Sequence, residues 1–278
     1  MLDEDSLPQP RGLLVPVANP EGVPALLTIA FAAPAPDDPP TRVLALVSRA
    51  SREISRDPPA ATPALKAAID YAASRGVSIM PLTVWSDRPG ADIIGAARTA
   101  NVRWVLLGYH RAASGHDTMG GVVRDVFASA RGVAVHVGVF VHGTDLPLER
   151  IHVTVDSGPD GRAALDLALR IASTGSAKVR ALLVSNTLAQ PEDDLVELIR
   201  TARKRMGRRF HSDVLSERTL DQLLNQSPGR LLIVGKKLAD EIHLPLDEAP
   251  EGERCVIVVQ GADEKPLDAD HRSRERHP

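Results

Sequence analysis

Aromatic side chains, cysteine and long apolar runs are all scarce in this sequence, and each shortage excludes a class of protein. Phe, Trp and Tyr make up 3% of the 278 residues, too few for the stacking platforms that bind single-stranded nucleic acid. The single cysteine, Cys255, cannot form a disulfide within one chain, and we expect it to be a small core residue. No stretch reaches the roughly eighteen consecutive apolar residues of a membrane-spanning helix.

Charge and targeting signals are also weak. The formal net charge of −3 argues against nonspecific DNA binding, so we expect no nucleic-acid partner. The first ten residues are acidic and contain prolines, without the apolar core of a secretory signal. We therefore expect a soluble, cytoplasmic protein.

Aliphatic residues supply most of the 43% hydrophobic content, and they fall in short runs that alternate with helical patterns. This alternation predicts βαβ crossovers, a parallel sheet and helices on both of its faces. Ligands of such sheets bind at the carboxyl ends of the strands, where the strand order reverses. The strands expected in the first half are 13–17, 43–47, 77–84, 102–107 and 133–141.

The second half repeats this pattern, and the repeat is clearest where LLVPVA at 13–18 is set beside IHVTVD at 151–156. We therefore predict an α/β protein with two tandem five-stranded parallel-sheet domains, at 12–143 and 150–260. Residues 1–11 and 261–278 are expected to be flexible tails. The strands expected in the second half are 151–155, 179–184, 210–215, 231–234 and 255–259, with helices at 191–206 and 219–226 among them.

The stretch from Val102 to Val126 carries the strongest local signal. An apolar strand breaks at Gly108, a polar loop follows, and the pair Gly120-Gly121 leads into a helix. A glycine-rich loop that ends at a helix N-terminus can hold phosphate oxygens through its backbone N–H groups. A plain strand-to-helix turn would give the same pattern.

This stretch is similar to the phosphate loop of the universal stress protein family, which reads glycine, two residues, glycine, nine residues, then glycine followed by serine or threonine. Gly108 and Gly121 match, whereas Arg111 replaces the second glycine and Val122 replaces the hydroxyl residue. The arginine fork would still donate to a phosphate, but valine offers no side-chain donor. The strand and helix pattern resembles the family from Gly12 to Gln260, which implies its adenine nucleotide alpha hydrolase-like fold.

In that family an aspartate at the end of the first strand reaches the nucleotide. Asp156 holds this place in the second half, where a plain turn or helix cap is the other interpretation, and Ala18 holds it in the first half. The second half in turn lacks the phosphate loop, so each half has lost one part of the site. We expect Asn19 to replace the lost aspartate and Val47 to line the base. The candidate nucleotide-binding residues are Val17, Asn19, Val47, Gly108, Arg111, Gly120, Gly121, Val122 and Asp156.

The resemblance implies a regulatory or sensor module that binds ATP or AMP. Tandem copies in the family occur as separate cytoplasmic proteins and as soluble tails of bacterial transporters, which implies a membrane transporter as partner. The family often dimerises through its fifth strand, so a homodimer or an internal pseudo-dimer is expected. The alternative is a ligand-free dimerisation or scaffold module with degenerate sites, in which the fifth strand of each half is available for pairing.

Catalytic and metal-binding motifs are not evident. The sequence has no Walker A pattern, no nucleophile elbow and no Cys/His cluster, so we expect neither enzyme activity nor a bound metal. A basic cluster at 204, 205, 208 and 209 is either a solvated helix end or a docking site for an acidic partner or lipid headgroups.

Overall fold

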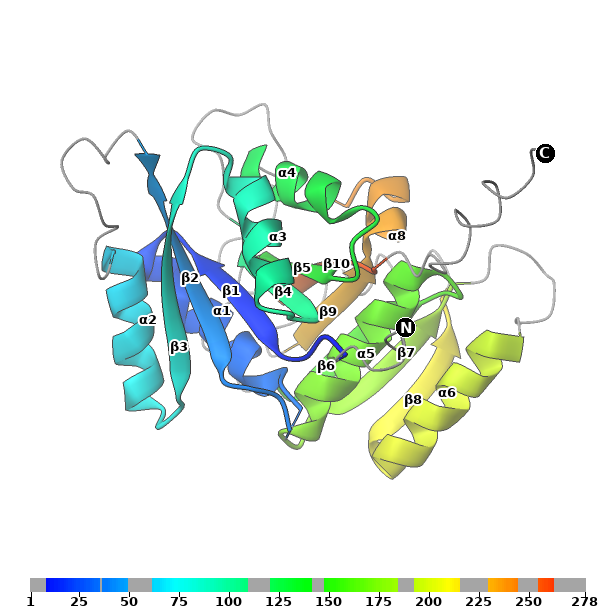
Figure 1. Ribbon diagram of the computed structural model, residues 1–278. Coiled ribbons are helices and arrows are strands. Elements are labelled where there is room, and N and C mark those ends of the chain that lie inside the picture. Colours follow the sequence, from blue (N-terminus) through cyan, green and yellow to red (C-terminus); the bar gives the residue numbers. More distant parts are fainter. Residues whose placement is uncertain are drawn as a thin grey trace, which may run out of the picture.

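A ten-stranded, mostly parallel sheet runs through the whole molecule (Figure 1). The computed structural model describes residues 9–35, 37–49, 62–109, 121–141, 148–184, 193–215, 230–244 and 255–262. The strands of the first half are β1 (Leu13–Val17), β2 (Thr41–Ser48), β3 (Ile79–Ser86), β4 (Trp104–Gly108) and β5 (His136–Val141). Those of the second half are β6 (Arg150–Val155), β7 (Lys178–Leu183), β8 (Phe210–Val214), β9 (Arg230–Gly235) and β10 (Cys255–Gln260).

The order of the strands shows how the repeat is built. It reads β3-β2-β1-β4-β5-β10-β9-β6-β7-β8, so both halves have the same internal order and meet through their last strands. β5 pairs antiparallel with β10, with Val139 opposite Val258, whereas all other pairs are parallel. The predicted α/β class and parallel pairing are confirmed, but the two expected sheets are one continuous sheet.

This pairing makes the two halves an internal pseudo-dimer. β5 lies between β4 and β10, and β10 lies between β5 and β9, so neither fifth strand has a free edge. The expectation that the fifth strands are available to another copy is therefore wrong, because each already pairs with the other. The limits proposed for two separate domains, 12–143 and 150–260, stay a prediction.

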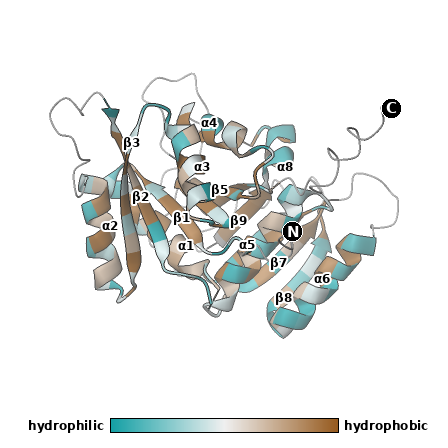
Figure 2. Cartoon of the chain, in the orientation of Figure 1, coloured by the Kyte–Doolittle hydropathy of each residue, from teal (hydrophilic) through white to brown (hydrophobic). Residues whose placement is uncertain are grey.

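Helices cover both faces of the sheet (Figure 1). Alternate side chains of β1 enter different cores: Leu13 and Val15 contact one, and Leu14 contacts the other. The first core also contains α1, α2, α5 and α6, whereas α3, α4 and α8 pack into the second. Figure 2 shows the hydrophobic colour along the strands between these layers. The helices are α1 (Val23–Ala32), α2 (Pro63–Ser74), α3 (Pro89–Thr99), α4 (Gly121–Ala130), α5 (Pro159–Ser173), α6 (Asp193–Met206) and α8 (Lys236–Glu241).

Three strands, β3, β4 and β5, begin later than the sequence pattern predicted. In β3 and β5 the first expected residues belong to the end of the preceding helix. Gly76 has φ +65°, and the N–H of Val77 turns back to the carbonyl of Ala72 at 3.0 Å. Gly132 has φ +71°, and the N–H of Val133 donates to the carbonyl of Ala130 at 3.0 Å. Both are helix ends closed by a glycine in the left-handed region, so β3 and β5 start two or three residues later.

Polar contacts between the halves reinforce the shared sheet. Arg170 on α5 reaches Asp38, in the connection from α1 to β2, with 3.1 Å between Nη1 and Oδ2, and only 14% and 8% of the two side chains are exposed. Close by, the hydroxyl of Thr174 donates to the carbonyl of Ala32 at 3.1 Å. The second half is therefore fixed to the first by side chains as well as by strands.

The proposed tails are partly anchored. The N–H of Arg11 donates to the carbonyl of Asn101 at 3.0 Å, and Gly261 and Ala262 both donate backbone hydrogen bonds to side chains. Residues 1–8 and 263–278 of the tails and the helix expected at 219–226 lie outside the described residues. Within the described ranges, no helix is long and apolar enough to cross a membrane.

Candidate functional site

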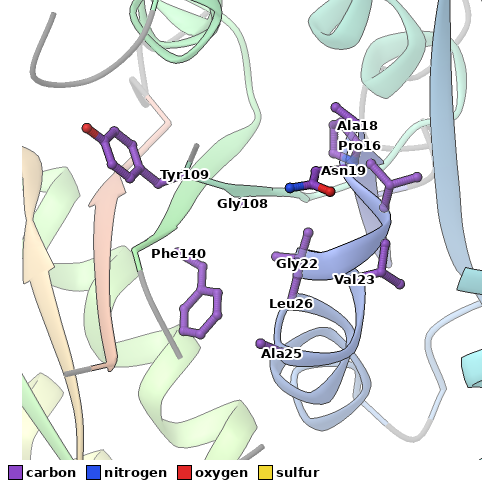
Figure 3. A pocket seen from close by; sticks show the side chains of 11 residues that line it. Pro16, Ala18, Asn19, Gly22, Val23, Ala25, Leu26, Gly108, Tyr109 and Phe140 are labelled. Atoms are coloured by element: carbon purple, nitrogen blue, oxygen red, sulfur yellow. The ribbon is translucent and has the colours of Figure 1, made fainter. Parts of the chain in front are cut away.

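A cavity opens where the strand order reverses in the first half. β1 pairs with β2 on one side, to which the chain leads next, and with β4 on the other. The carboxyl ends of these strands therefore border a crevice, the usual ligand position in such sheets. The cavity has a volume of about 180 Å³. Its lining residues come from the ends of β1 and β4, the start of α1 and β5, namely Pro16, Val17, Ala18, Asn19, Gly22, Val23, Ala25, Leu26, Gly108, Tyr109 and Phe140 (Figure 3).

Asn19 is the polar side chain at the rim of this cleft. It follows β1 directly and caps a short 3₁₀ turn at Pro20–Gly22, where its Oδ1 accepts from the N–H of Glu21 at 3.1 Å. Figure 3 shows the amide projecting from the end of β1 toward Gly108. Because the cap uses only the oxygen, the two N–H donors of Nδ2 remain available to a ligand.

The remaining wall is made mainly by apolar side chains and carries no charged side chain among the described residues. Val17 closes one side of the cavity, and Phe140 forms part of its floor. Phe140 lies opposite Gly108 in the parallel pairing of β4 with β5. The N–H of Tyr109 donates to the carbonyl of Phe140 at 2.7 Å, which holds the chain after β4 against β5. No Lys, Arg, His, Asp or Glu side chain is among the described residues that line the cavity. Such a wall suits a flat apolar group with a hydrogen-bonding edge.

The structure places the predicted site residues unevenly. Val17, Asn19 and Gly108 line one cavity, whereas Val47, near the end of β2, is half-buried and does not line it. Two further candidates, Gly121 and Val122, are the first residues of α4.

These two residues do not form a tight turn in the described structure. The Val122 side chain is 44% exposed, and a Cβ on Gly121 would meet no atom within 4 Å, so nothing in the described surroundings requires glycine there. Arg111 and Gly120 lie outside the described residues.

Asp156 belongs to a separate location. The strands of the second half run antiparallel to those of the first, so the carboxyl end of β6 is not part of the first-half cleft. Asp156 accepts at Oδ1 from the N–H of Gly158 at 2.8 Å, the geometry of an Asx turn. The first turn of α5 packs closely behind it, because a Cβ on Gly161 would collide with the Asp156 backbone. Its observed contacts are those of a turn-former.

Asp160 fills the equivalent crevice of the second half. One carboxylate oxygen, Oδ2, accepts from the N–H of Lys237 at 3.0 Å in the first turn of α8, and Oδ1 accepts from Gly261 after β10 at 2.8 Å. A Cβ on Gly235, at the end of β9, would lie 3.1 Å from the Asp160 Cβ. A side chain of the protein itself therefore takes the backbone donors that an external anion would use.

The sequence analysis missed Asp160 and the aromatic wall. An acidic residue in the first turn of a helix is common because it complements the helix dipole, so Asp160 carried no distinguishing signal. Phe140 could have been found from the alignment of Gly108 with the carboxyl end of the next strand. As for metals, no group of three or more His, Cys, Asp or Glu side chains is gathered within the described ranges.

No protein-family model matches the sequence, and no curated protein matches it. Solved structures do resemble it. A universal stress protein from Archaeoglobus fulgidus DSM 4304 aligns with 92% of this chain and 98% of its own, with a TM-score of 0.53 and 15% identity. The cytoplasmic domain of a prokaryotic cation chloride cotransporter aligns with 92% and 97%, with a TM-score of 0.54 and 13% identity. The resemblance predicted from the glycine loop and the repeat is thus confirmed for the fold: this chain has the fold of the universal stress proteins.

Proposed function

We propose that this protein is a regulatory or sensor module that binds an adenine nucleotide in the first-half cleft and has no catalytic role. The observation that supports the proposal is the cavity at the reversal of strand order, where Val17, Asn19 and Gly108 meet. The fold alone does not argue for a ligand, because one fold serves many functions. The position and chemistry of this cavity do.

The cavity suits the base of a nucleotide better than its phosphates. Its lining side chains are mainly apolar and none is charged, and the Asn19 amide would donate to a ring nitrogen of a purine. The volume of about 180 Å³ is below the roughly 300 to 1,000 Å³ typical of drug-sized ligands. We therefore assign the described cavity to the base and assign the phosphates to the glycine loop beyond Tyr109, with Arg111 as their side-chain partner.

The two halves would then differ in function. Asp160 occupies the backbone donors in the second-half crevice, and a nucleotide phosphate would have to displace a carboxylate held by two hydrogen bonds. We infer one nucleotide per chain, bound in the first half. The second half serves as the structural partner that completes the sheet.

The partner we propose is a membrane transporter, with this module on its cytoplasmic side. The support is the likeness of the whole described fold to a domain whose name places it in a cation chloride cotransporter. In this arrangement nucleotide binding would be the signal and the transporter would be the output.

The test is titration calorimetry of the stripped protein with ATP and AMP, preceded by mass spectrometry of any nucleotide released on denaturation. Ala18→Phe is the diagnostic variant, because Ala18 is exposed and lines the cavity, so a ring there fills the cleft without disturbing the core. Ala73→Phe, on an exposed position of α2, is the matched control. We expect micromolar binding that Ala18→Phe abolishes and Ala73→Phe preserves.

Two results would contradict the proposal. Equal nucleotide affinity in both variants would remove the cavity from the site. If the unmodified protein bound no nucleotide at millimolar concentration, nucleotide binding would be ruled out. The ligand-free scaffold would then be the function to test, by a search for proteins that bind at the edges of the sheet.

A further inference from the structure

A second, larger cavity lies at the amino-terminal ends of β6, β7 and β8. Its volume is about 570 Å³, and α6 borders it on one side through Arg203. Neither the glycine loop nor the repeat pointed to this part of the chain. The lining residues are Arg150, His152, Lys178, Val179, Arg180, Arg203, Phe210, His211, Ser212 and Asp213.

Positive charge dominates this lining. Arg150, Lys178, Arg180 and Arg203 carry four formal positive charges, against one carboxylate, Asp213. All four basic side chains are exposed. The concentration is local, because the whole chain carries a net charge of −3, and a concave surface of one sign focuses the field on an anion.

Two of the guanidinium groups are already held in place. Arg180 approaches Asp213 with 2.7 Å between Nε and Oδ2, and Nη2 of Arg203 donates to the hydroxyl of Ser212 at 3.2 Å. Each contact uses one nitrogen of the fork and leaves other N–H donors for a ligand. These contacts thus orient the two guanidinium groups and leave N–H donors available, which lowers the entropic cost of binding.

Within the described part of the chain, neither Arg150 nor Lys178 makes an ion pair, although both lie on strands whose backbones are fixed by the sheet. The dipole of α6 explains basic residues in its last turn, Arg203 among them. It does not explain the cations on β6 and β7, which follow no helix C-terminal turn directly.

We propose that this cavity binds a small anion that carries at least two phosphate charges and no nucleobase. Arginine forks match phosphate oxygens in pairs, and lysine supplies a compact charge beside them. The apolar lining residues, Phe210 and Val179, have buried side chains, and the exposed ring of the lining is the polar imidazole of His211. The lining therefore presents polar and charged groups to a ligand, without an apolar face for a base. The proposal does not depend on the nucleotide cleft, which lies in the other half.

Lys178→Glu tests the cavity, and Lys204→Glu is its matched control. Both side chains are exposed, both changes alter the net charge by the same amount, and Lys204 belongs to the same basic end of the second half without lining the cavity. The probe is inorganic pyrophosphate, titrated calorimetrically into the full chain at low salt. We expect affinity to fall about tenfold or more in Lys178→Glu and to change by less than about twofold in Lys204→Glu.

A second measurement distinguishes a lipid phosphate from a soluble phosphate as the ligand. Sedimentation with phosphatidylcholine vesicles that contain phosphatidic acid tests a lipid phosphate, and free pyrophosphate is added as competitor. Competition, together with weaker sedimentation of Lys178→Glu alone, would identify the headgroup as a ligand of the cavity. Pyrophosphate binding without sedimentation would identify a soluble ligand.

Two outcomes would overturn the proposal. Pyrophosphate affinity that is unchanged in Lys178→Glu would show that the cavity is not the site. Equal losses in Lys178→Glu and Lys204→Glu would show a diffuse electrostatic effect of the basic surface, with no role for the cavity itself.

Discussion

The ring of His136 accepts, at Nδ1, a hydrogen bond of 2.9 Å from the backbone N–H of Ala262. An accepting nitrogen carries no proton, so the imidazole is neutral, with its proton on Nε2. The bond joins the start of β5, in the first half, to the chain just after β10. The ring also lies against Trp104, with 4.7 Å between ring centroids. A neutral histidine therefore fixes the end of the second half against the first.

Stability should decrease in mild acid because of this histidine. Burial, assisted by the positive charge of Arg103 and opposed by Asp166, lowers the pKa of His136 from 6.5 to about 4. Below pH 6.5 this histidine is protonated in the unfolded chain, whereas in the folded chain it stays neutral until about pH 4. The free energy of unfolding should fall across this interval by up to about 3 kcal/mol.

Urea denaturation at several pH values, for the unmodified protein and His136→Gln, measures this effect. Glutamine does not titrate, and its carbonyl can still accept a hydrogen bond, so the gap between the two proteins should narrow from pH 7 to pH 4. A gap that stays constant across this range would show that His136 does not carry the acid sensitivity.

Asp160→Asn should destabilise the second half. The carboxylate accepts from the N–H groups of both Lys237 and Gly261, whereas an amide can accept from one and would present its own donors to the other. We expect a loss of about 1 to 3 kcal/mol, measured by urea denaturation. Asp70→Asn is the control, because among the described residues Asp70 pairs with Lys66 alone, in an exposed ion pair on α2. Equal behaviour of the two variants would refute the role given to Asp160.

Two glycines in helices should respond in opposite directions to alanine. A Cβ on Gly161 would collide with the backbone of Asp156, whereas one on Gly95, exposed within α3, would meet nothing within 4 Å. Gly161→Ala should cost more than about 2 kcal/mol of unfolding free energy. Gly95→Ala should gain about 0.5 to 1 kcal/mol from helix propensity. Thermal denaturation of both variants measures the two changes in stability. The prediction is wrong if Gly161→Ala does not change the stability.

The ion pair between the halves should be costly to break from one side. Arg170→Met would leave the Asp38 carboxylate buried without its cation, and we expect a loss of about 3 kcal/mol. The double variant Arg170→Met with Asp38→Asn should recover part of that loss, because the buried charge is gone. A double-mutant cycle of unfolding free energies, measured in urea, gives the coupling energy between the two side chains. If the effects of the two single variants simply add, the side chains do not interact.

The sequence predicted the elements well because their signals are local. Strands such as β1 and helices such as α6 follow directly from apolar spacing and from the glycines and prolines between them. The junction of the halves could not be predicted in this way. Both β5 and β10 are apolar on both faces, and a buried strand has the same composition whether its neighbour is parallel, antiparallel or missing.

The candidate site was predictable only where a motif coincided with a strand end. Gly108 and Asn19 follow apolar strands and were found from that position, and the structure places both at the cavity. Asp160 acts through contacts with α8 and with the chain after β10, which no local pattern encodes. Phe140 is recognised only when β5 is aligned with β4. Val47 was assigned by analogy with the end of a strand, and its side chain is not part of the described cavity wall.

The antiparallel contact of β5 with β10 also constrains how the protein is made. β10 leaves the ribosome after the whole first half, so until it is synthesised β5 has no partner on the side that β10 later covers. Such edges template association with other chains, and pairings between distant segments form slowly. Nascent chains truncated before β10 should therefore associate with one another or with chaperones, and synthesis of β10 places the exposed edge of β5 at the centre of the sheet.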